Sequence, residues 1–427
     1  MKSLLHIIEQ HKAGRSVGIY SACSAHPLVI EAALIHARRR SCFALIEATS
    51  NQVNQDGGYT GMRPADFSRF VLAIAARLGV PQEQVLLGGD HLGPNCWQGL
   101  CAEAALAKSE QLIADYVEAG FRKIHLDCSM SCADDPVPLT DALVAARAVR
   151  LCAVAERTWR RVGGEAPVYV VGTEVPVPGG AQESLGELAV TEARAASATI
   201  DAHRDAFWAA GLQPVWPRVI GLVVQPGVEF DHHKVIDFQA HRAAGLAGVI
   251  ETQPHMVYEC HSTDYQGPAN LRALVQGHFA ILKVGPGLTF AMREALWALD
   301  QIEREWLGQE RSSLLRETVI KAMAAEPRFW DKYYLSTGRQ LALDQQHSLS
   351  DRIRYYWPLP AVEAALDRLL ANLDANPPPL TLLSQYLPLQ YEAIRAGRIR
   401  LCARELVLHA IDRVLEQYSA ACNDTPS

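Results

Sequence analysis

Residues 84–91 read Gln-Val-Leu-Leu-Gly-Gly-Asp-His, an apolar run that stops at an aspartate and a histidine. Seven other segments of the chain have the same form. Each is nearly continuous in Val, Ile, Leu and Ala, which is expected of strands that are covered on both faces. The eight predicted strands are Ser16–Ser24, Cys42–Thr49, Gln84–His91, Lys123–Ser129, Val168–Val175, Arg218–Gln225, His255–Ser262 and Phe279–Gly287.

The segments between these strands have the period of amphipathic helices. Pro64–Leu78 begins with Pro and has Asp in its first turn, and its apolar residues recur every three or four positions. Cys101–Ala119 and Leu139–Val162 follow the same pattern. Eight strands alternating with helices predict an α/β protein with a parallel (β/α)₈ TIM barrel. The alternative, a doubly wound open sheet, is disfavoured because no Gly-x-Gly-x-x-Gly follows the first strand.

The strand pattern stops after Glu305, so we expect a barrel over residues 1–305 and a C-terminal helical extension, packed on the barrel, over residues 306–427. Four amphipathic helices are predicted in the extension: Arg311–Ala325, Ala361–Leu373, Leu382–Ala396 and Ala403–Ala420.

Composition excludes several classes of protein. The 427 residues are 49% hydrophobic and 20% charged, which argues against disorder. Forty Lys and Arg against forty-seven Asp and Glu give a net charge of −7, so no nucleic-acid partner is expected. Charged residues interrupt the first twelve positions, and no apolar stretch is long enough to span a membrane. With ten cysteines and no Cys-x-x-Cys, the chain is predicted to be cytoplasmic and reduced.

Polar residues stand at the ends of the predicted strands, and a barrel brings these ends to one mouth. A single Asp or Glu after a strand is often only a helix cap, but five strands ending in Asp, Glu or His favour a shared polar pocket. The predicted site residues at the strand ends are Glu47, Asp90, His91, Asp127, Glu174, Gln225, His261, Ser262, Asp264, Lys283 and Gly285.

His91, Glu174 and His261 are predicted to bind a divalent metal, because imidazole and carboxylate together suit Zn, Mn or Co. Asp90 and Glu174 are the predicted catalytic residues, with Asp90 moving a proton beside the metal. The alternative is that both histidines only satisfy hydrogen bonds in a polar barrel mouth. The sixth predicted strand fits this metal site poorly, since Gln225 stands where a third nitrogen ligand would be expected.

A substrate that carries a phosphate group is expected. Ser262, the Gly285-Pro286-Gly287 turn and Thr289 lie where barrels often bind phosphate, although the turn could also be only a tight connection. Glu47, Asp127, Gln225, Asp264 and Lys283 are predicted to contact the rest of the substrate. Arg352 and Arg354 could add positive charge from the extension, or could form surface ion pairs. No phosphate-binding GxxxxGK[ST] is present, so no nucleotide is expected.

Several longer blocks of the sequence resemble the GatZ/KbaZ family over nearly the full chain. They are residues 46–55 (IEATSNQVNQ), 88–97 (GGDHLGPNCW), 172–180 (GTEVPVPGG), 224–230 (VQPGVEF), 258–266 (YECHSTDYQ) and 350–358 (SDRIRYYWP). The resemblance implies an accessory subunit of tagatose-1,6-bisphosphate aldolase and a sugar phosphate as the substrate. Such a subunit supports the activity and stability of a class II aldolase Y subunit, in an oligomer that serves galactitol, N-acetylgalactosamine or tagatose catabolism.

The same resemblance implies a second possible function, because members of the wider family look like metal-dependent tagatose 6-phosphate 4-epimerases that yield fructose 6-phosphate. The class II aldolase pattern implies that Asp90 transfers protons, that His91 and His261 bind zinc, and that Glu174 matches a strand-five carboxylate. Gln225 and Gly285 depart from that pattern, where a His and an Asn would be expected. These departures are compatible with a site that has a chemistry other than aldol cleavage.

Overall fold

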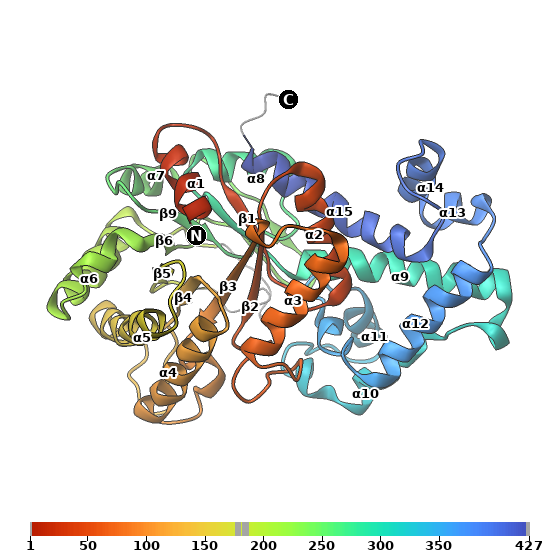
Figure 1. Ribbon diagram of the computed structural model, residues 1–427. Helices are drawn as coiled ribbons and strands as arrows, with labels where there is room; N and C mark the ends of the chain where they lie inside the picture. The colour runs from red at the N-terminus through yellow and green to blue at the C-terminus, as the bar shows by residue number, and fades with distance from the viewer. Residues whose placement is uncertain (1, 176–180, 182–187, 424–427) are drawn as a thin grey trace.

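The computed structural model describes residues 2–175, 181 and 188–423. Residues 176–180, the last five of the 172–180 block, lie outside the described part. A closed barrel of eight parallel strands forms the centre of the molecule (Figure 1). The TIM barrel prediction is therefore confirmed. Seven of the eight barrel strands lie within predicted segments, and the third strand runs one residue past the predicted end at His91. In order around the barrel, the strands are β1 (Ile19–Ala22), β2 (Ala44–Thr49), β3 (Val85–Leu92), β4 (Lys123–Leu126), β5 (Val168–Gly172), β6 (Val219–Val223), β9 (Val257–Cys260) and β10 (Ile281–Val284).

A helix follows each barrel strand and covers its outer face. Many of these helices begin at a proline, whose missing N–H is not needed in the first turn. A two-stranded ladder, β7 (Glu229–Phe230) with β8 (Val235–Ile236), lies in the connection after β6. The helices are α2 (Pro27–Arg40), α3 (Pro64–Leu78), α4 (Ala102–Glu118), α5 (Asp141–Val162), α6 (Ala193–Ala209), α7 (Ala244–Glu251), α8 (Pro268–Gln276) and α9 (Pro286–Leu307).

The barrel interior changes from apolar to charged along its axis. Helix α1 (Lys2–Lys12) inserts Leu4 and Ile8 into a buried apolar layer at the end where the strands begin. The strands contribute Ile19, Leu45, Leu86, Val168, Ile220, Val257 and Ile281 to that layer. Inward-facing side chains recur every second residue of a strand. The next inward residues of β2, β9 and β10 are therefore Glu47, Glu259 and Lys283, and this end of the barrel carries the polar groups.

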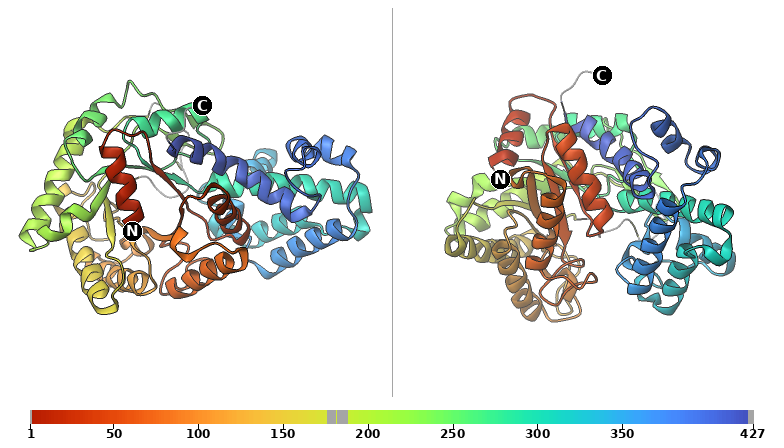
Figure 2. Two further views of the ribbon diagram at one scale, coloured as in Figure 1. Left: turned by 45° about the horizontal axis from the view of Figure 1, so that its top comes forward. Right: turned by 45° about the vertical axis from the view of Figure 1, so that its right-hand side comes forward.

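The extension begins on α9 and projects from one side of the barrel (Figure 2). One predicted helix, Leu382–Ala396, is two helices in the structure, because Leu387 leaves helical geometry (φ −136°, ψ 58°) in front of Pro388. A further helix, α11, was not among those predicted. The helices of the extension are α10 (Leu315–Ala325), α11 (Gly338–His347), α12 (Pro360–Ala375), α13 (Leu380–Tyr386), α14 (Pro388–Arg395) and α15 (Ala403–Cys422).

The last helix, α15, returns from the extension to the barrel. It packs against α2, α8 and α9, and its end reaches β1, where the Gly18 N–H donates to the Cys422 carbonyl (2.9 Å). The wall of the barrel between α8 and α2 is thus built from the C-terminal end of the chain (Figure 1). None of the described helices has the length and apolar character needed to cross a membrane.

Candidate active site

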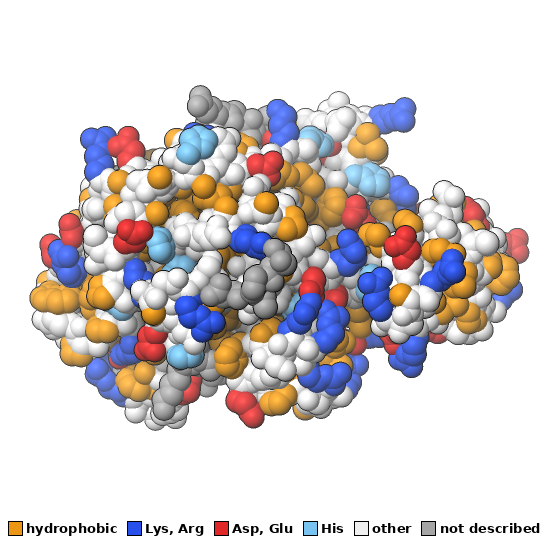
Figure 3. All heavy atoms as spheres, turned by 90° about the horizontal axis from the view of Figure 1, so that it is seen from above, with side chains coloured by type: hydrophobic (Ala, Val, Ile, Leu, Met, Phe, Trp, Pro, Cys, Tyr) orange, Lys and Arg blue, Asp and Glu red, His pale blue; other side chains and the backbone are white. Residues whose placement is uncertain are grey.

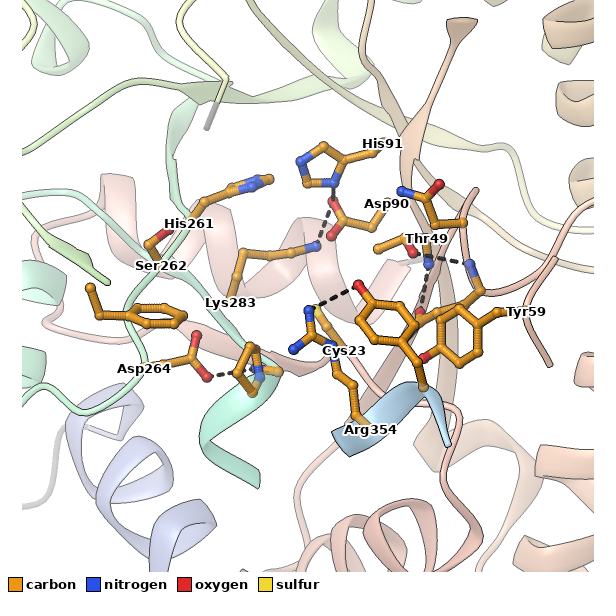
Figure 4. Close-up of a pocket in the computed structure, with 16 residues that line it drawn as sticks. Cys23, Thr49, Tyr59, Asp90, His91, His261, Ser262, Asp264, Lys283 and Arg354 are labelled. Atoms are coloured by element: carbon orange, nitrogen blue, oxygen red, sulfur yellow. Dashed lines mark hydrogen bonds and ion pairs between the residues drawn. The ribbon is translucent and has the colours of Figure 1, made fainter. Parts of the chain in front are cut away.

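A pocket of about 80 Å³ opens at the carboxyl ends of the barrel strands (Figure 4). Its walls come from the barrel mouth and from one short segment of the extension. The lining residues are Cys23, Thr49, Asn51, Gln52, Tyr59, Asp90, His91, Phe230, His261, Ser262, Asp264, Lys283, Gly285, Pro286, Arg354 and Tyr355.

Four buried charged side chains form the floor beneath this pocket. The Lys123 ammonium lies 2.7 Å from Glu47 Oε1 and 2.5 Å from Glu259 Oε2. Lys283 contacts Glu47 as well and lies 3.8 Å from Glu259 Oε1. Gly88 leaves room for this network, since a Cβ there would lie 2.6 Å from Glu47 Oε1. Alternating charges allow these groups to be buried together, because unpaired ions in the interior are very costly.

Asp90 stands above this floor, at the centre of the hydrogen-bond network of the pocket. Its Oδ1 lies 2.9 Å from Lys283 Nζ and 2.9 Å from His91 Nδ1 (Figure 4). The same oxygen lies 3.1 Å from His125 Nδ1. Burial alone would raise the pKa of Asp90, but the charge of His91 and the hydrogen bonds from His125 and His91 outweigh it. The pKa of Asp90 consequently lies well below its usual value, so this carboxylate is ionised at neutral pH.

Three histidine rings meet beside Asp90. The ring centroids of His91, His125 and His261 are 4.8–5.3 Å apart. His261 Nε2 lies 2.9 Å from Glu259 Oε1, so a carboxylate orients this imidazole just as Asp90 orients His125.

These groups fit a divalent metal ion. Asp90, His125, Glu259 and His261 each offer a ligand atom, and the four atoms lie within 4.8 Å of one another. In addition, His125 Nε2 is buried without a hydrogen-bond partner among the described residues. Imidazoles held by carboxylates are the usual surroundings of zinc and related ions.

Backbone strain is concentrated at the same place. His91 (φ 76°), the last residue but one of β3, and Ser262 (φ 54°), two residues after β9, lie in the left-handed region that non-glycine residues rarely adopt. Such conformations cost about 1–3 kcal/mol each and are concentrated at functional sites. Here they aim two polar side chains into the pocket (Figure 4).

The Gly285-Pro286-Gly287 turn after β10 donates main-chain hydrogen bonds to a carboxylate. Asp264 Oδ1 accepts hydrogen bonds from the N–H groups of Gly285 (2.9 Å) and Gly287 (2.7 Å). Burial nevertheless raises the pKa of Asp264 to about 6. Burial also lowers the pKa of Lys283, to about 8. A phosphate bound at this turn would therefore lie close to the Asp264 carboxyl group, which accepts the N–H hydrogen bonds of the turn.

Arg354 brings positive charge to the pocket from the extension. Its guanidinium donates to Tyr355 Oη (3.0 Å) and to main-chain carbonyls, and no carboxylate is within ion-pair distance in the described part of the chain. Burial would raise the pKa of Tyr355, but the charges of Arg354 and Arg352 lower it overall. An arginine without a carboxylate partner at the edge of a pocket is suited to a phosphate group.

The structure does not bring all the predicted site residues together. Glu47, Asp90, His91, His261, Ser262, Asp264, Lys283 and Gly285 lie in the pocket or directly beneath it. The others are engaged locally. Glu174 is exposed and accepts a hydrogen bond from Thr191, Gln225 accepts from the N–H groups of Gly227 and Val228, Asp127 accepts from Ser129, and Thr289 donates to Asp351.

Three residues of the candidate site were not predicted from the sequence: Lys123, His125 and Glu259. They lie in β4 and β9, before the carboxyl ends of these strands. The signal was the alternation of polar residues within two apolar runs, Lys123-Ile-His125-Leu-Asp127 and Glu259-Cys-His261. This period of two places each set on one side of its strand, facing the barrel interior.

Fold and site together define a TIM barrel protein with a candidate metal site at the mouth of the barrel. Within that class, the chain belongs to the family described as D-tagatose-1,6-bisphosphate aldolase subunit GatZ/KbaZ-like, whose model matches residues 4–423.

One solved structure is similar throughout, that of a probable tagatose 6 phosphate kinase from Sinorhizobium meliloti 1021. It shares 51% sequence identity with a TM-score of 0.88, over 95% of this chain and 100% of that chain. A fructose-bisphosphate aldolase from Campylobacter jejuni is more distant, with 12% identity and a TM-score of 0.45 over 87% of this chain and 91% of that one. The YdjI aldolase from Escherichia coli K12 has 11% identity and a TM-score of 0.41, over 90% and 97%. Similarity at the last two levels supports no inference about function.

Proposed function

We propose that this protein is a metal-dependent 4-epimerase that interconverts tagatose 6-phosphate and fructose 6-phosphate. The observation that carries the proposal is Asp90, an ionised carboxylate held in the pocket by Lys283 and two histidines. The family description and the name of the 51% identical protein both refer to tagatose phosphates, which supports the choice of substrate.

Inversion at C4 can proceed by cleavage and re-formation of the C3–C4 bond. Asp90 accepts the proton of the C4 hydroxyl, the C3–C4 bond breaks, and its electron pair stays on the C3 side as an enediolate. The other fragment is glyceraldehyde 3-phosphate, which turns its opposite carbonyl face towards C3. The bond then re-forms, and Asp90 returns the proton to the C4 oxygen, so that no atom is gained or lost.

A divalent ion would supply positive charge beside the substrate oxygens on which negative charge develops. We propose His91, His125 and His261 as the residues that hold it, with Asp90 and Glu259 orienting the imidazoles or joining them as ligands. Glu174 remains a proposed ligand from the sequence, although its side chain is exposed here. Lys283 and Arg354 supply the other cationic groups in the pocket, and Arg354 is suited to the 6-phosphate.

The second candidate is the accessory role, which the word "subunit" in the family description favours. In this role the protein would bind a class II aldolase Y subunit and support its activity in a mixed oligomer. The extension exposes apolar side chains that could contribute to such an interface, among them Leu335 (81% exposed), Leu343 (44%) and Leu389 (45%).

The decisive experiment is NMR of tagatose 6-phosphate with the purified protein alone, loaded in turn with Zn²⁺, Mn²⁺ or Co²⁺. We expect fructose 6-phosphate to appear, and Asp90→Asn to slow its formation about 10²–10⁴-fold, as for loss of a proton-transfer group. The exposed Asp205→Asn is the matched control and should have the wild-type rate.

Absence of product with every metal would overturn the epimerase proposal. The accessory role would then be tested by co-purification with a class II aldolase and by the activity of that aldolase with and without this protein. A Leu335→Asp variant should weaken the complex if the extension forms the interface.

A further inference from the structure

A basic cavity of about 410 Å³ adjoins the pocket at the barrel mouth, which is called the mouth pocket below. The two cavities share Asn51, Tyr59 and Tyr355, so a ligand in one is next to the other. The basic cavity is lined by Asn51, Gly58, Tyr59, Arg328, Phe329, Lys332, Tyr333, Arg352 and Tyr355.

The lining of the basic cavity has three cationic side chains and no carboxylate. Elsewhere on the surface the two signs are mixed, as the face in Figure 3 shows. Arg328 has one acidic neighbour, Glu326, at 3.4 Å, and both side chains are largely exposed, so this ion pair is weak. Lys332 is exposed as well.

Arg352 is the residue on which the argument for an anion site depends, because it is only 4% exposed and yet lines the cavity. Its Nε donates to the Phe329 carbonyl, and no carboxylate forms an ion pair with it in the described part of the chain. Its guanidinium lies over the rings of Tyr333 (3.3 Å to the centroid) and Tyr355 (4.8 Å). Aromatic faces offset part of the cost of burying a cation, but they do not neutralise it.

The aromatic side chains also fix the shape of the cavity. Phe329 and Tyr355 are stacked at 5.0 Å with an interplanar angle of 6°, and Tyr59 meets Tyr355 edge to face at 4.7 Å. The buried guanidinium is therefore held in one place, with two exposed cations beside it. This is the arrangement by which arginine clusters recognise phosphate oxygens.

We propose that the basic cavity is a second anion site, distinct from Arg354 in the mouth pocket, that binds a phosphate group. The phosphate can be free inorganic phosphate or the second phosphate of a ketose 1,6-bisphosphate. Both present the same dianion to Arg352, Arg328 and Lys332. The site is defined by its own residues and does not depend on the epimerase proposal.

The test is calorimetric titration of the metal-loaded protein with inorganic phosphate, tagatose 6-phosphate and tagatose 1,6-bisphosphate. The titrations are made on an Arg354→Met background, which weakens the competing anion site. The Arg328→Ala/Lys332→Ala double variant removes only exposed side chains, so its folding should be preserved. Lys321→Ala, an exposed lysine of α10 outside the cavity, is the matched control.

We expect the double variant to weaken the binding of inorganic phosphate or of the bisphosphate about tenfold, and Lys321→Ala to leave it unchanged. Loss confined to the bisphosphate would assign the site to a second phosphate of the substrate, and loss of inorganic phosphate binding would assign it to a free anion. The proposal is overturned if the double variant binds all three ligands like its parent, or if Lys321→Ala weakens them equally. The 4-epimerase rate with tagatose 6-phosphate is a separate measurement, so the two proposals can fail independently.

Discussion

Lys123 shows how a single charged residue can determine the geometry of a whole site. It has no contact with solvent, and its ammonium joins Glu47 and Glu259 across the interior of the barrel. Glu259 in turn orients His261, while Glu47 contacts Lys283 below Asp90. The groups in the pocket therefore depend on a lysine that does not line it.

Replacing Lys123 by Met should be strongly destabilising, because the change removes the charge and leaves two carboxylates buried side by side. We expect the free energy of unfolding to fall by about 3–5 kcal/mol, the range for breaking a buried ion pair. Chemical denaturation measures this loss directly. The same substitution at the exposed Lys321 should change stability by less than about 0.5 kcal/mol, and a similar loss at both positions would contradict the explanation.

The residues of the site could be predicted only in part from the sequence. Asp90, His91 and His261 stand at strand ends, where barrel topology alone brings them together. His125 and Glu259 stand inside strands that otherwise look like ordinary buried apolar runs, so a search for polar strand ends passes over them. Arg354 enters the pocket from the extension, and no local pattern specifies how the extension folds back over the mouth.

At the scale of elements, the connection from β4 to α5 is held by one buried ion pair. Arg147 of α5 donates to both oxygens of Asp135, at 2.7 and 2.5 Å, and both side chains are only 6% exposed. The hydrogen bonds from Arg147 lower the pKa of Asp135 to about 2. This pair fixes the loop after β4 on the helix that follows it.

The lowered pKa gives a prediction about acid stability. A carboxylate whose pKa is about 2 when folded and about 3.9 when unfolded stabilises the protein fully above pH 4. That contribution is lost as the pH falls from about 4 to 2. Asp135→Asn should therefore be less stable than wild type at pH 7, and the difference should shrink towards pH 2. Thermal unfolding from pH 7 to pH 2 measures it, with Asp205→Asn as the exposed control; a constant difference across this range would contradict the assignment.

Helix boundaries in the extension show the limits of periodicity as a guide. The apolar period runs continuously through residues 382–396, but Pro388 ends the helix there because it has no N–H to donate to the preceding turn. Helix α11 is mostly polar and buries only Asp344 fully, so it has no apolar stripe to detect. Barrel strands were easier to predict, because most of them are short and apolar and nearly all of their residues are buried.

For the whole molecule, Tyr418 is the clearest link between the end of the chain and the active site. Its hydroxyl donates to the Thr263 carbonyl (2.7 Å), next to Ser262 and Asp264 of the pocket, and its ring packs on Tyr20 of β1. The side chain is 2% exposed, so the hydrogen bond is sheltered from water.

Tyr418→Phe should leave the Thr263 carbonyl without this donor and lower the free energy of unfolding by about 1–3 kcal/mol. Tyr391→Phe, at a partly exposed tyrosine of α14 whose hydroxyl only accepts from Arg395 (3.3 Å), should cost less than about 0.5 kcal/mol. Denaturant titrations of the two variants side by side make the comparison. Equal stability of the two variants would show that the link contributes nothing measurable.

The return of α15 to the barrel has a consequence for synthesis in the cell. The last barrel strand, β10, is synthesised more than a hundred residues before α15, yet β1, α2, α8 and α9 cannot bury their shared surface until residues 403–422 emerge. The surface that α15 covers therefore stays accessible to chaperones and proteases until translation is almost finished. A chain whose synthesis stops within the extension would contain both predicted catalytic residues, Asp90 and Glu174, but would lack α15, the helix that completes the wall of the barrel.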